Sequence, residues 1–392
     1  MSPRPSRRAA PSTVAACLLG CLAGLSVCVP SASGAAPAGV PLSSAIEADN
    51  GSWAVLPMGD LSSPLNTFWQ VLHAAPESSR WSVVTPQGVA DNGGLVAGAS
   101  AVSTLIGTLP SQQLRFSPLS VSTDGGSSWN PVLLPGGLAA RPDALATAGT
   151  ATGGSLAIVG TTVLRARPSF ASWSPLVSLR RLDRATPRCG VTALDAVTVA
   201  ATGAPLVATG CGRGGIVAVF TPSAGSWIHV GTTLPRRLGA SSTSVVRLES
   251  GGPVTTALVA ARRSGQNANV LVALWQKAGA WTASAPLALP SNRSLLASSV
   301  GPGGTVAVVV GPKSAPVAYD LVPGGAWTRL PPLPPATSAL GPLEAAVGSG
   351  GPSLDAFTVA GTALGVYALT PSGTSWDKAQ SIQVPLAYGS SG

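Results

Sequence analysis

Short apolar runs, separated by glycine and proline, dominate the chain beyond its N-terminal region. Runs of four to seven residues recur, for example within segments 93–99, 154–160, 205–210 and 303–311. They are continuously apolar rather than alternating, which is typical of strands buried on both faces of a sheet. Gly and Pro interrupt every stretch of 15 to 20 residues, which excludes helix bundles and coiled coils. The pattern therefore predicts an all-β chain of many short strands.

A recurring tryptophan divides these strands into repeats. Seven of the ten Trp residues each follow a turn of small residues, at intervals of 44 to 54 residues, at positions 81, 129, 173, 227, 281, 327 and 376. A period of this length, with several short strands per repeat, predicts a β-propeller with one four-stranded sheet per repeat. Seven units favour seven blades. The unit 40–87 is irregular because it also holds Trp53 and Trp69, so six blades plus an N-terminal extension is the alternative.

The first 35 residues have the organisation of a secretory signal peptide. Three arginines within residues 1–8 precede an apolar core at 13–29, and small residues follow it. Cleavage is predicted after Gly34 or Ala35, leaving residues 36–392 as a single propeller domain. An uncleaved anchor and a lipoprotein attached at Cys21 are the less favoured alternatives. No later apolar run is long enough to span a bilayer, so we expect a secreted or extracytoplasmic protein.

Cysteine usage agrees with export. Three of the five cysteines lie within the predicted signal peptide, which leaves Cys189 and Cys211 in the mature chain. An isolated pair in an oxidising compartment favours a disulfide. We therefore predict a Cys189–Cys211 bond that joins the two ends of a hairpin.

Composition narrows the classes of partner. Only 9% of the residues are charged and 45% are hydrophobic, which excludes intrinsic disorder through high charge. The formal net charge is +9, but no run of Lys and Arg exceeds two residues. Nucleic-acid binding is therefore not predicted, and a monomer is expected. The partner is unknown from the sequence, with an envelope glycan or a surface protein as the candidates.

One segment resembles a known family. Ser122, Asp124, Gly126, Ser128 and Trp129 match the Asp-box, Ser-x-Asp-x-Gly-x-Ser/Thr-Trp, at every position. The segment is similar to the bacterial neuraminidase repeat of sialidase-like propellers. Asp124 is expected to accept backbone N–H groups within the turn, Gly126 to adopt positive φ, and Trp129 to pack over the hairpin. In that family the box is a structural element, so the resemblance implies a fold more than a function.

Because sialidases have this type of propeller, the resemblance also raises the possibility that the protein is a sialidase-like enzyme. Sialidases use three arginines, a Tyr–Glu pair and an acidic residue, together with an N-terminal Phe/Tyr-Arg-Ile-Pro motif that this sequence lacks. Tyr367 with Glu344 is the conceivable pair, but no motif surrounds it. His73 and His229 are far from the cysteines in sequence, so no metal site or other cofactor is predicted. A non-catalytic protein is favoured over a carbohydrate-active hydrolase, which remains the alternative.

Loops that join the outer strand of one blade to the inner strand of the next are the predicted binding region. Such loops meet at one rim of a propeller, and loops on a rigid scaffold often carry binding residues. Arginine in them favours carboxylate or phosphate groups, so we expect an anionic ligand such as an acidic envelope glycan. The candidate binding residues are Asp91, Asn92, Arg141, Asp143, Arg188, Arg237, Arg293 and Glu344, with Arg236 and Asn292 beside them.

Overall fold

The chain forms two compact units, Met1–Ala35 and Ala36–Gly392. The computed structural model describes residues 44–48, 51–59, 67–76, 78–86, 95–99, 103–108, 118–134, 142–148, 154–167, 170, 172–251, 253–264, 269–289, 294–301, 303–312, 315–334, 339–348, 351–360 and 362–384. All of these belong to the second unit. The predicted signal peptide and its cleavage point lie outside the described residues.

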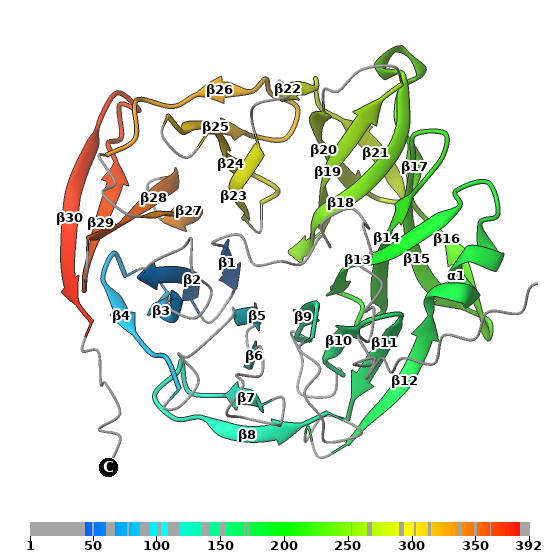
Figure 1. Ribbon diagram of the computed structural model, residues 1–392, viewed down its shortest axis with the longest axis horizontal. Coiled ribbons are helices and arrows are strands. Elements are labelled where there is room, and N and C mark those ends of the chain that lie inside the picture. The colour runs from blue at the N-terminus through cyan, green and yellow to red at the C-terminus, as the bar shows by residue number, and fades with distance from the viewer. Residues whose placement is uncertain are drawn as a thin grey trace, which may run out of the picture. The chain divides into compact units, whose positions relative to one another are not determined.

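Antiparallel meanders of four strands recur along the second unit; three of them are separate sheets, and the other four are joined in pairs into an 8-stranded and a 10-stranded sheet (Figure 1). In the first half of the chain they are β1 (Ser44–Ala48), β2 (Gly51–Gly59), β3 (Thr67–Ala74) and β4 (Trp81–Val83); β5 (Leu95–Ala99), β6 (Thr104–Thr108), β7 (Pro118–Ser122) and β8 (Asn130–Leu133); β9 (Ala144–Ala146), β10 (Leu156–Val159), β11 (Thr162–Ala166) and β12 (Trp173–Ser178). The strands are short because Gly-rich turns end them.

The same arrangement continues to the end of the described chain. The later meanders are β13 (Val191–Val199), β14 (Pro205–Cys211), β15 (Ile216–Ser223) and β16 (Ser226–His229); β18 (Ala240–Gly251), β19 (Val254–Arg263), β20 (Asn269–Lys277) and β21 (Ala280–Ala283); β23 (Ser294–Val300), β24 (Val306–Gly311), β25 (Val317–Leu321) and β26 (Thr328–Arg329); β27 (Ala339–Gly348), β28 (Gly351–Ala360), β29 (Ala363–Leu369) and β30 (Trp376–Gln383). The predicted all-β fold is confirmed.

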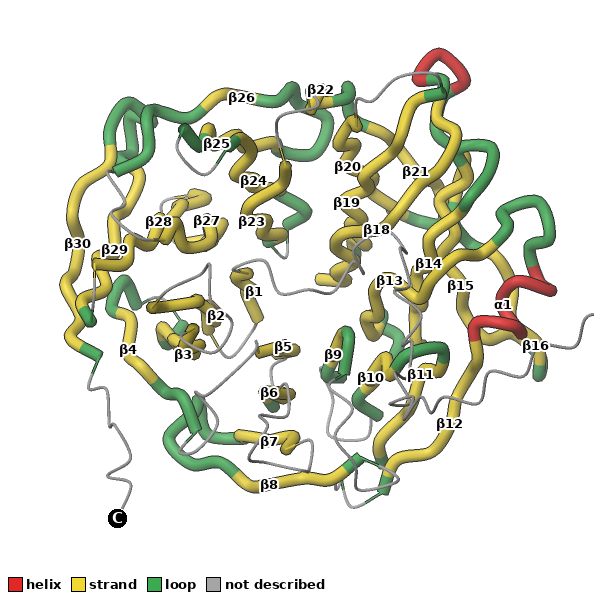
Figure 2. The backbone as a smooth tube through the Cα atoms, viewed as in Figure 1, coloured by secondary structure: helices red, strands yellow, loops and turns green. Residues whose placement is uncertain are grey.

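Four short elements lie in the connections between meanders. β17 (Thr232–Thr233) pairs with β15, and β22 (Leu287–Leu289) pairs with β20. The helix α1 (Leu179–Ala185) and the 3-10 turn η2 (Arg236–Leu238) are the helical segments of the described chain (Figure 2). Neither helical segment is long enough to span a membrane.

Within the second unit, the first strand of each meander lies nearest the centre and the last strand lies outermost (Figure 1). The hydrophobic core is divided into clusters, each of which joins two neighbouring meanders, the first and the last among them. One cluster, for example, packs Leu119 and Leu134 against Ala157 and Trp173. Because both faces of a middle strand are covered in this way, the strand can be apolar at every position. All seven residues of β14 are buried, as are all six of β24.

The recurring tryptophans connect neighbouring meanders. The indole Nε1–H of Trp129 donates to the carbonyl oxygen of Val84 at 2.8 Å, and Trp281 donates to Val230 at 2.6 Å. Trp327 and Trp376 make the equivalent bonds to Ala285 and Pro331 at 2.9 and 3.3 Å. In each case the acceptor follows the last strand of the preceding meander. The sequence period therefore marks contacts between repeats as well as turns within them.

Side chains also join the first and last meanders. The backbone N–H of Trp81 donates to Gln380 Oε1 at 2.9 Å, and Gln380 Nε2 donates to the Trp81 carbonyl at 2.8 Å. The Trp81 indole donates to Asp355 at 2.8 Å and meets the ring of Phe357 edge-on. Trp81 and Gln380 are 299 positions apart in the sequence, and Trp81 and Asp355 are 274 apart.

Candidate functional site

Half of the predicted binding residues fall within the part of the chain that the structure describes. Asp91, Asn92, Arg141 and Arg293 lie outside it, as does Asn292. Asp143, Arg188, Arg237 and Glu344 lie inside it, on four different connections or strands.

Glu344 was predicted to lie in a connecting loop, and this prediction is wrong. It lies within β27, opposite Asp355 of β28. The Gly341-Pro342 pair suggests the end of a strand in the sequence. In the fold it is accommodated by an irregularity in register between Leu340 and Leu343, so the strand continues through it.

Asp143 stabilises a turn of its own meander. Its carboxylate accepts the Gly160 N–H at 2.9 Å, and its backbone N–H donates to the Ile158 carbonyl at 2.7 Å. These bonds hold the β10–β11 turn against the start of β9. The carboxylate therefore has a structural partner next to the predicted rim.

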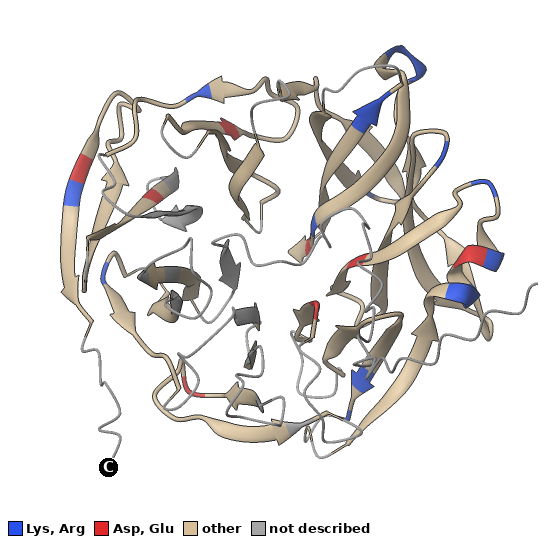
Figure 3. Cartoon of the chain, in the orientation of Figure 1, with Lys and Arg blue, Asp and Glu red and all other residues tan. Residues whose placement is uncertain are grey.

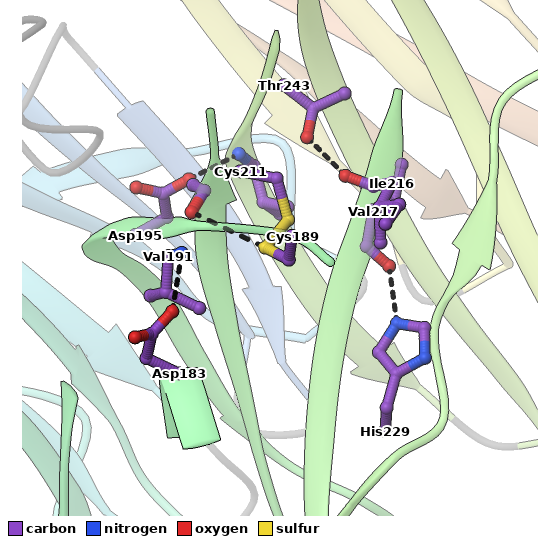
Figure 4. Close-up of a disulfide and its surroundings, with 11 residues drawn as sticks. Asp183, Cys189, Val191, Asp195, Cys211, Ile216, Val217, His229 and Thr243 are labelled. Carbon is purple, nitrogen blue, oxygen red and sulfur yellow. Dashed lines mark hydrogen bonds between the residues drawn. A yellow bond between two sulfur atoms is a disulfide. The ribbon is translucent and has the colours of Figure 1, made fainter. Parts of the chain in front are cut away.

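Arg188 is exposed at a corner held by the disulfide. The predicted Cys189–Cys211 bond is present, with both cysteines fully buried (Figure 4). It joins the residues before β13 to the end of β14, and the Gly212 N–H donates to the Gly190 carbonyl at 3.0 Å. On the other side, the Asp183 carboxylate of α1 accepts the Val191 N–H at 3.0 Å. The position of the Arg188 backbone is thus fixed from two directions.

A second arginine lies directly beside this corner. Arg213, in the β14–β15 turn, is exposed, and its side chain passes over Gly190. A Cβ built on Gly190, whose φ is +59°, would lie 3.5 Å from Arg213 Nε. The connection before β13 and the turn after β14 therefore present their arginines together.

Two further loops extend the same surface. The Leu234 N–H donates to the Gly215 carbonyl at 2.9 Å, which ties the connection carrying η2 to the Arg213 turn. The Ser264 N–H donates to the Gly239 carbonyl at 2.9 Å, which ties the β19–β20 turn to the end of η2. The first loop carries the adjacent pair Arg236 and Arg237, and the adjacent pair Arg262 and Arg263 ends β19 directly before the second turn.

We call this set the arginine surface; its members are Arg188, Arg213, Arg236, Arg237, Arg262 and Arg263. The first five are exposed, and Arg263 is partly buried with its Nε lacking a hydrogen-bond partner. The loop segments 186–190, 212–215, 231–239 and 261–264 contain no acidic residue. Figure 3 shows basic residues gathered over the loops on the right of the view. The surface can therefore attract an anion without competition from acids in the same loops.

A separate group of charged residues lies on the inner strands. Asp195 occupies a bulge of β13, where the pairing with β14 shifts between Leu194 and Ala196. Its carboxylate accepts the Val245 N–H of β18 at 2.7 Å, and it also bonds Ser244 and the Gly210 N–H. Burial raises the pKa of Asp195 to about 7, although these hydrogen bonds lower it in part. The carboxyl group thus links two neighbouring meanders.

A second charged group consists of Arg247 and Glu249 on β18. A bulge in β18 turns their side chains toward β23, away from Asp195. The pairing with β19 shifts between Val245 and Arg247, so Arg247 faces β23, where its Nε–H donates to Ser298 Oγ at 3.0 Å. Glu249, two residues further along the strand, lies on the same side. Burial raises the pKa of Glu249 to about 7 and the Arg247 guanidinium opposes this shift. Burial also lowers the pKa of Arg247.

Asp195 and Glu249 do not form a glycosidase pair with each other. Asp195 contacts β18 at Val245 from the β13 side, whereas Glu249 faces β23 four residues further along. Four residues of strand span roughly 13 Å. The two carboxyl groups of a glycosidase lie about 5 to 10 Å apart on one substrate. Tyr367, the tyrosine considered as a nucleophile, packs into the apolar cluster between the last two meanders.

The segment Ser122–Trp129 has the local bonds expected of its sequence. Asp124 accepts the Ser128 N–H and hydroxyl at 2.9 and 2.5 Å, and the Ser122 hydroxyl at 2.8 Å. The Ser128 hydroxyl contributes most to a lowered pKa of Asp124. Gly126 has φ of +85° and lies against Val84 of the preceding meander. The turn is a structural element, and its Asp124 oxygens are occupied.

Sequence reasoning missed Arg213, Arg262 and Arg263 because it considered only the connections between repeats. Arg213 lies in a hairpin turn within a repeat, and Arg262 and Arg263 are the last two residues of β19, directly before such a turn. The available signal was an arginine beside or within a Gly-rich or small-residue turn. In the described part of the molecule, no three His, Cys, Asp or Glu side chains gather as metal ligands.

Comparison with known proteins establishes the fold class. No protein-family model matches the chain, and no curated protein is significantly similar to it. A candidate 6-phosphogluconolactonase from Bacteroides uniformis aligns over 86% of this chain and 97% of its own, with 10% identity and a TM-score of 0.52. A candidate 6-phosphogluconolactonase from Bacteroides fragilis aligns over 86% and 96%, with 11% identity and a TM-score of 0.49.

The Bacteroides uniformis structure, the one of the two with a TM-score above 0.5, is a β-propeller-like protein. At this identity the likeness concerns the fold. The protein is therefore a β-propeller-like all-β protein with one disulfide between Cys189 and Cys211.

Proposed function

We propose that the protein is an exported seven-bladed β-propeller that binds an anionic glycan outside the cytoplasmic membrane without chemically changing it. The carrying observation is that the exposed Arg188 and Arg237 lie on connections between meanders whose backbones are tied to the ring. Rigid presentation of arginine favours bidentate contacts with carboxylate groups.

Two observations support the export part of the proposal. The boundary between the two compact units falls after Ala35, where signal cleavage is predicted. The disulfide also fits an oxidising compartment. The seven-blade assignment takes each four-stranded meander as one blade. The Asp-box family is proposed on the sequence of Ser122–Trp129 and its local bonds.

A binding role is favoured over the hydrolase alternative because several carboxylates form hydrogen bonds that stabilise the fold. Asp124, Asp143 and Asp195 each accept backbone N–H groups, and Asp355 accepts the Trp81 indole. A carboxylate that holds a turn or a strand contact is poorly placed to attack or protonate a substrate.

The test uses the mature chain 36–392 on an array of neutral and acidic glycans. We expect retention of uronic acid-containing glycans, weaker binding at higher salt, and recovery of each glycan intact by mass spectrometry. In parallel, expression of the full chain should yield an extracytoplasmic product that begins near residue 35 or 36. Release of shortened sugars would show a hydrolase, and equal retention of neutral and acidic glycans would contradict the anionic ligand.

A further inference from the structure

We infer that the arginine surface is the binding site for an extended acidic polysaccharide, which crosses four loops of two neighbouring meanders. This inference rests on the proposed function and deepens it. It assigns the site to a specific surface and the ligand to a linear polymer that carries carboxylates.

The four loops form a continuous row through their backbone contacts. Gly190 bonds Gly212, Gly215 bonds Leu234, and Gly239 bonds Ser264, so each loop is tied to the next. Backbones joined in this way are about 5 Å apart. The Debye length at physiological salt is about 8 Å, so the fields of arginines on adjacent loops reinforce one another.

The row is preorganised because each loop is held by the fold. The disulfide holds the first two loops, and the Thr243 hydroxyl of β18 bonds the Ile216 carbonyl just after the second (Figure 4). Gly239 ends η2 with a φ of +59°, which directs the chain into β18 directly after the arginine pair. A ligand would therefore meet arginines whose backbone positions are already fixed, which lowers the entropic cost of binding.

The charge pattern favours a polymer over a small anion. Five exposed arginines are spread one or two to a loop, with no acid in any of the four loops. Two acids next to these loops are engaged by backbone donors: Asp183 accepts the Val191 N–H, and Asp195 accepts the Val245 N–H. A ligand with a carboxylate on each repeating unit can contact several loops at once, and linked contacts raise affinity well above that of one unit.

The loop composition favours a polysaccharide over a nucleic acid. The segments 186–190, 212–215, 231–239 and 261–264 contain no Phe, Tyr or Trp. Proteins that bind single-stranded nucleic acids combine basic grooves with aromatic side chains on which bases stack. Arginine alone suits the planar carboxylates of uronic acids through paired N–H donors.

The experiment compares two variants of the mature chain with equal charge. One carries Arg188→Gln, Arg213→Gln, Arg237→Gln and Arg262→Gln. The control carries Gln at four arginines outside the surface that are also exposed: Arg80, Arg165, Arg167 and Arg329. Binding is measured by calorimetry with galacturonate, with oligogalacturonates of increasing length and with polygalacturonate, each at two salt concentrations. Circular dichroism melting shows whether both variants fold.

We expect the wild type and the control to bind the polymer with an affinity that rises with oligomer length and falls with salt. The surface variant should bind at least tenfold more weakly, with a smaller salt dependence. If both variants bind like the wild type, the arginine surface is not the site and Arg188 and Arg237 do not carry the proposed function, although the binding of an acidic glycan itself stands. If the wild type binds no acidic glycan, the proposed function fails too. If double-stranded DNA binds as tightly as polygalacturonate at the same salt, the assignment to a polysaccharide is overturned.

Discussion

The acidity of the Asp195 carboxyl group is controlled mainly by burial. Only 3% of the residue is exposed, and the donors around it are the Val245 and Gly210 N–H groups and Ser244. Hydrogen bonds to the charged form lower a carboxyl pKa, and desolvation raises it. Here desolvation is the larger effect, and the pKa is about 7. Glu249, on the other side of β18, is raised to a similar value for the same reason.

This gives the protein a pH-dependent stability with a definite sign. A carboxyl pKa that is higher in the folded than in the unfolded state makes the folded protein bind protons more strongly between the two values. Stability should therefore fall as pH rises from about 4 to 7, and change little above that from these groups. We expect the free energy of unfolding to be about 1 to 3 kcal/mol higher at pH 5 than at pH 8, since each unit of pKa shift is worth about 1.4 kcal/mol.

Urea unfolding at pH 5 and pH 8 measures this difference, with Asp195→Asn as the test variant. The variant should be less stable overall, because an amide cannot accept all the donors, but its pH dependence should be smaller. Asp377→Asn, at an exposed position of β30, is the matched control and should behave like the wild type. Equal slopes for wild type and Asp195→Asn would show that Asp195 does not titrate as described.

The disulfide connects the first two strands of its meander, β13 and β14, at their open end. Val191 pairs with Cys211, and the opposite end of the hairpin closes at Val199 and Pro205. The bond spans 22 residues and keeps the Arg188 and Arg213 loops together. The helix α1 packs on the outer side of the same corner, where Leu182 is fully buried. Elements of one meander therefore set the geometry of two of the four loops that make up the arginine surface.

Removing the disulfide should lower the free energy of unfolding, because the bond restricts the unfolded chain. For a loop of this length the chain-entropy estimate is about 3 kcal/mol. We expect the Cys189→Ala/Cys211→Ala variant to show this loss in urea unfolding, with the fold retained by circular dichroism. Wild-type protein digested without reduction should yield a linked peptide pair by mass spectrometry. A variant as stable as the wild type would contradict a structural role for the bond.

The first and last meanders meet through side chains rather than through a shared strand, while β1 of the first meander also pairs in parallel with β23 of the sixth. Gln380 of β30 bonds both backbone polar groups of Trp81, and Phe357 and Leu364 pack against Leu56 and Leu72. Burial raises the pKa of Asp355, and the Trp81 indole hydrogen bond opposes that shift. In a closed ring both faces of every meander are covered by neighbouring meanders. Contacts between the first and last meanders should therefore add to the stability of the whole ring.

Gln380→Ala should therefore weaken the contact between the ends of the chain. Loss of two hydrogen bonds should cost about 1 to 3 kcal/mol. Hydrogen exchange should accelerate in β4 and β30 together, since both strands lie at this contact. Gln383→Ala, at an exposed position of the same strand, is the control and should leave exchange in β4 unchanged. Faster exchange in β30 without any change in β4 would contradict a shared closing contact.

Several features of the protein follow from the amino-acid sequence because they depend on local rules. The all-β fold follows from short apolar runs and Gly-rich turns, the repeat from the tryptophan period, and the Cys189–Cys211 bond from an isolated pair. Other features depend on which distant segments pair. The bulges that turn Asp195 and Arg247 to opposite neighbours have no local signature, and β27 continues past a Gly-Pro pair to include Glu344. The arginine surface collects residues from 188 to 263 because backbone hydrogen bonds join four loops, and those bonds exist only once the meanders have packed together.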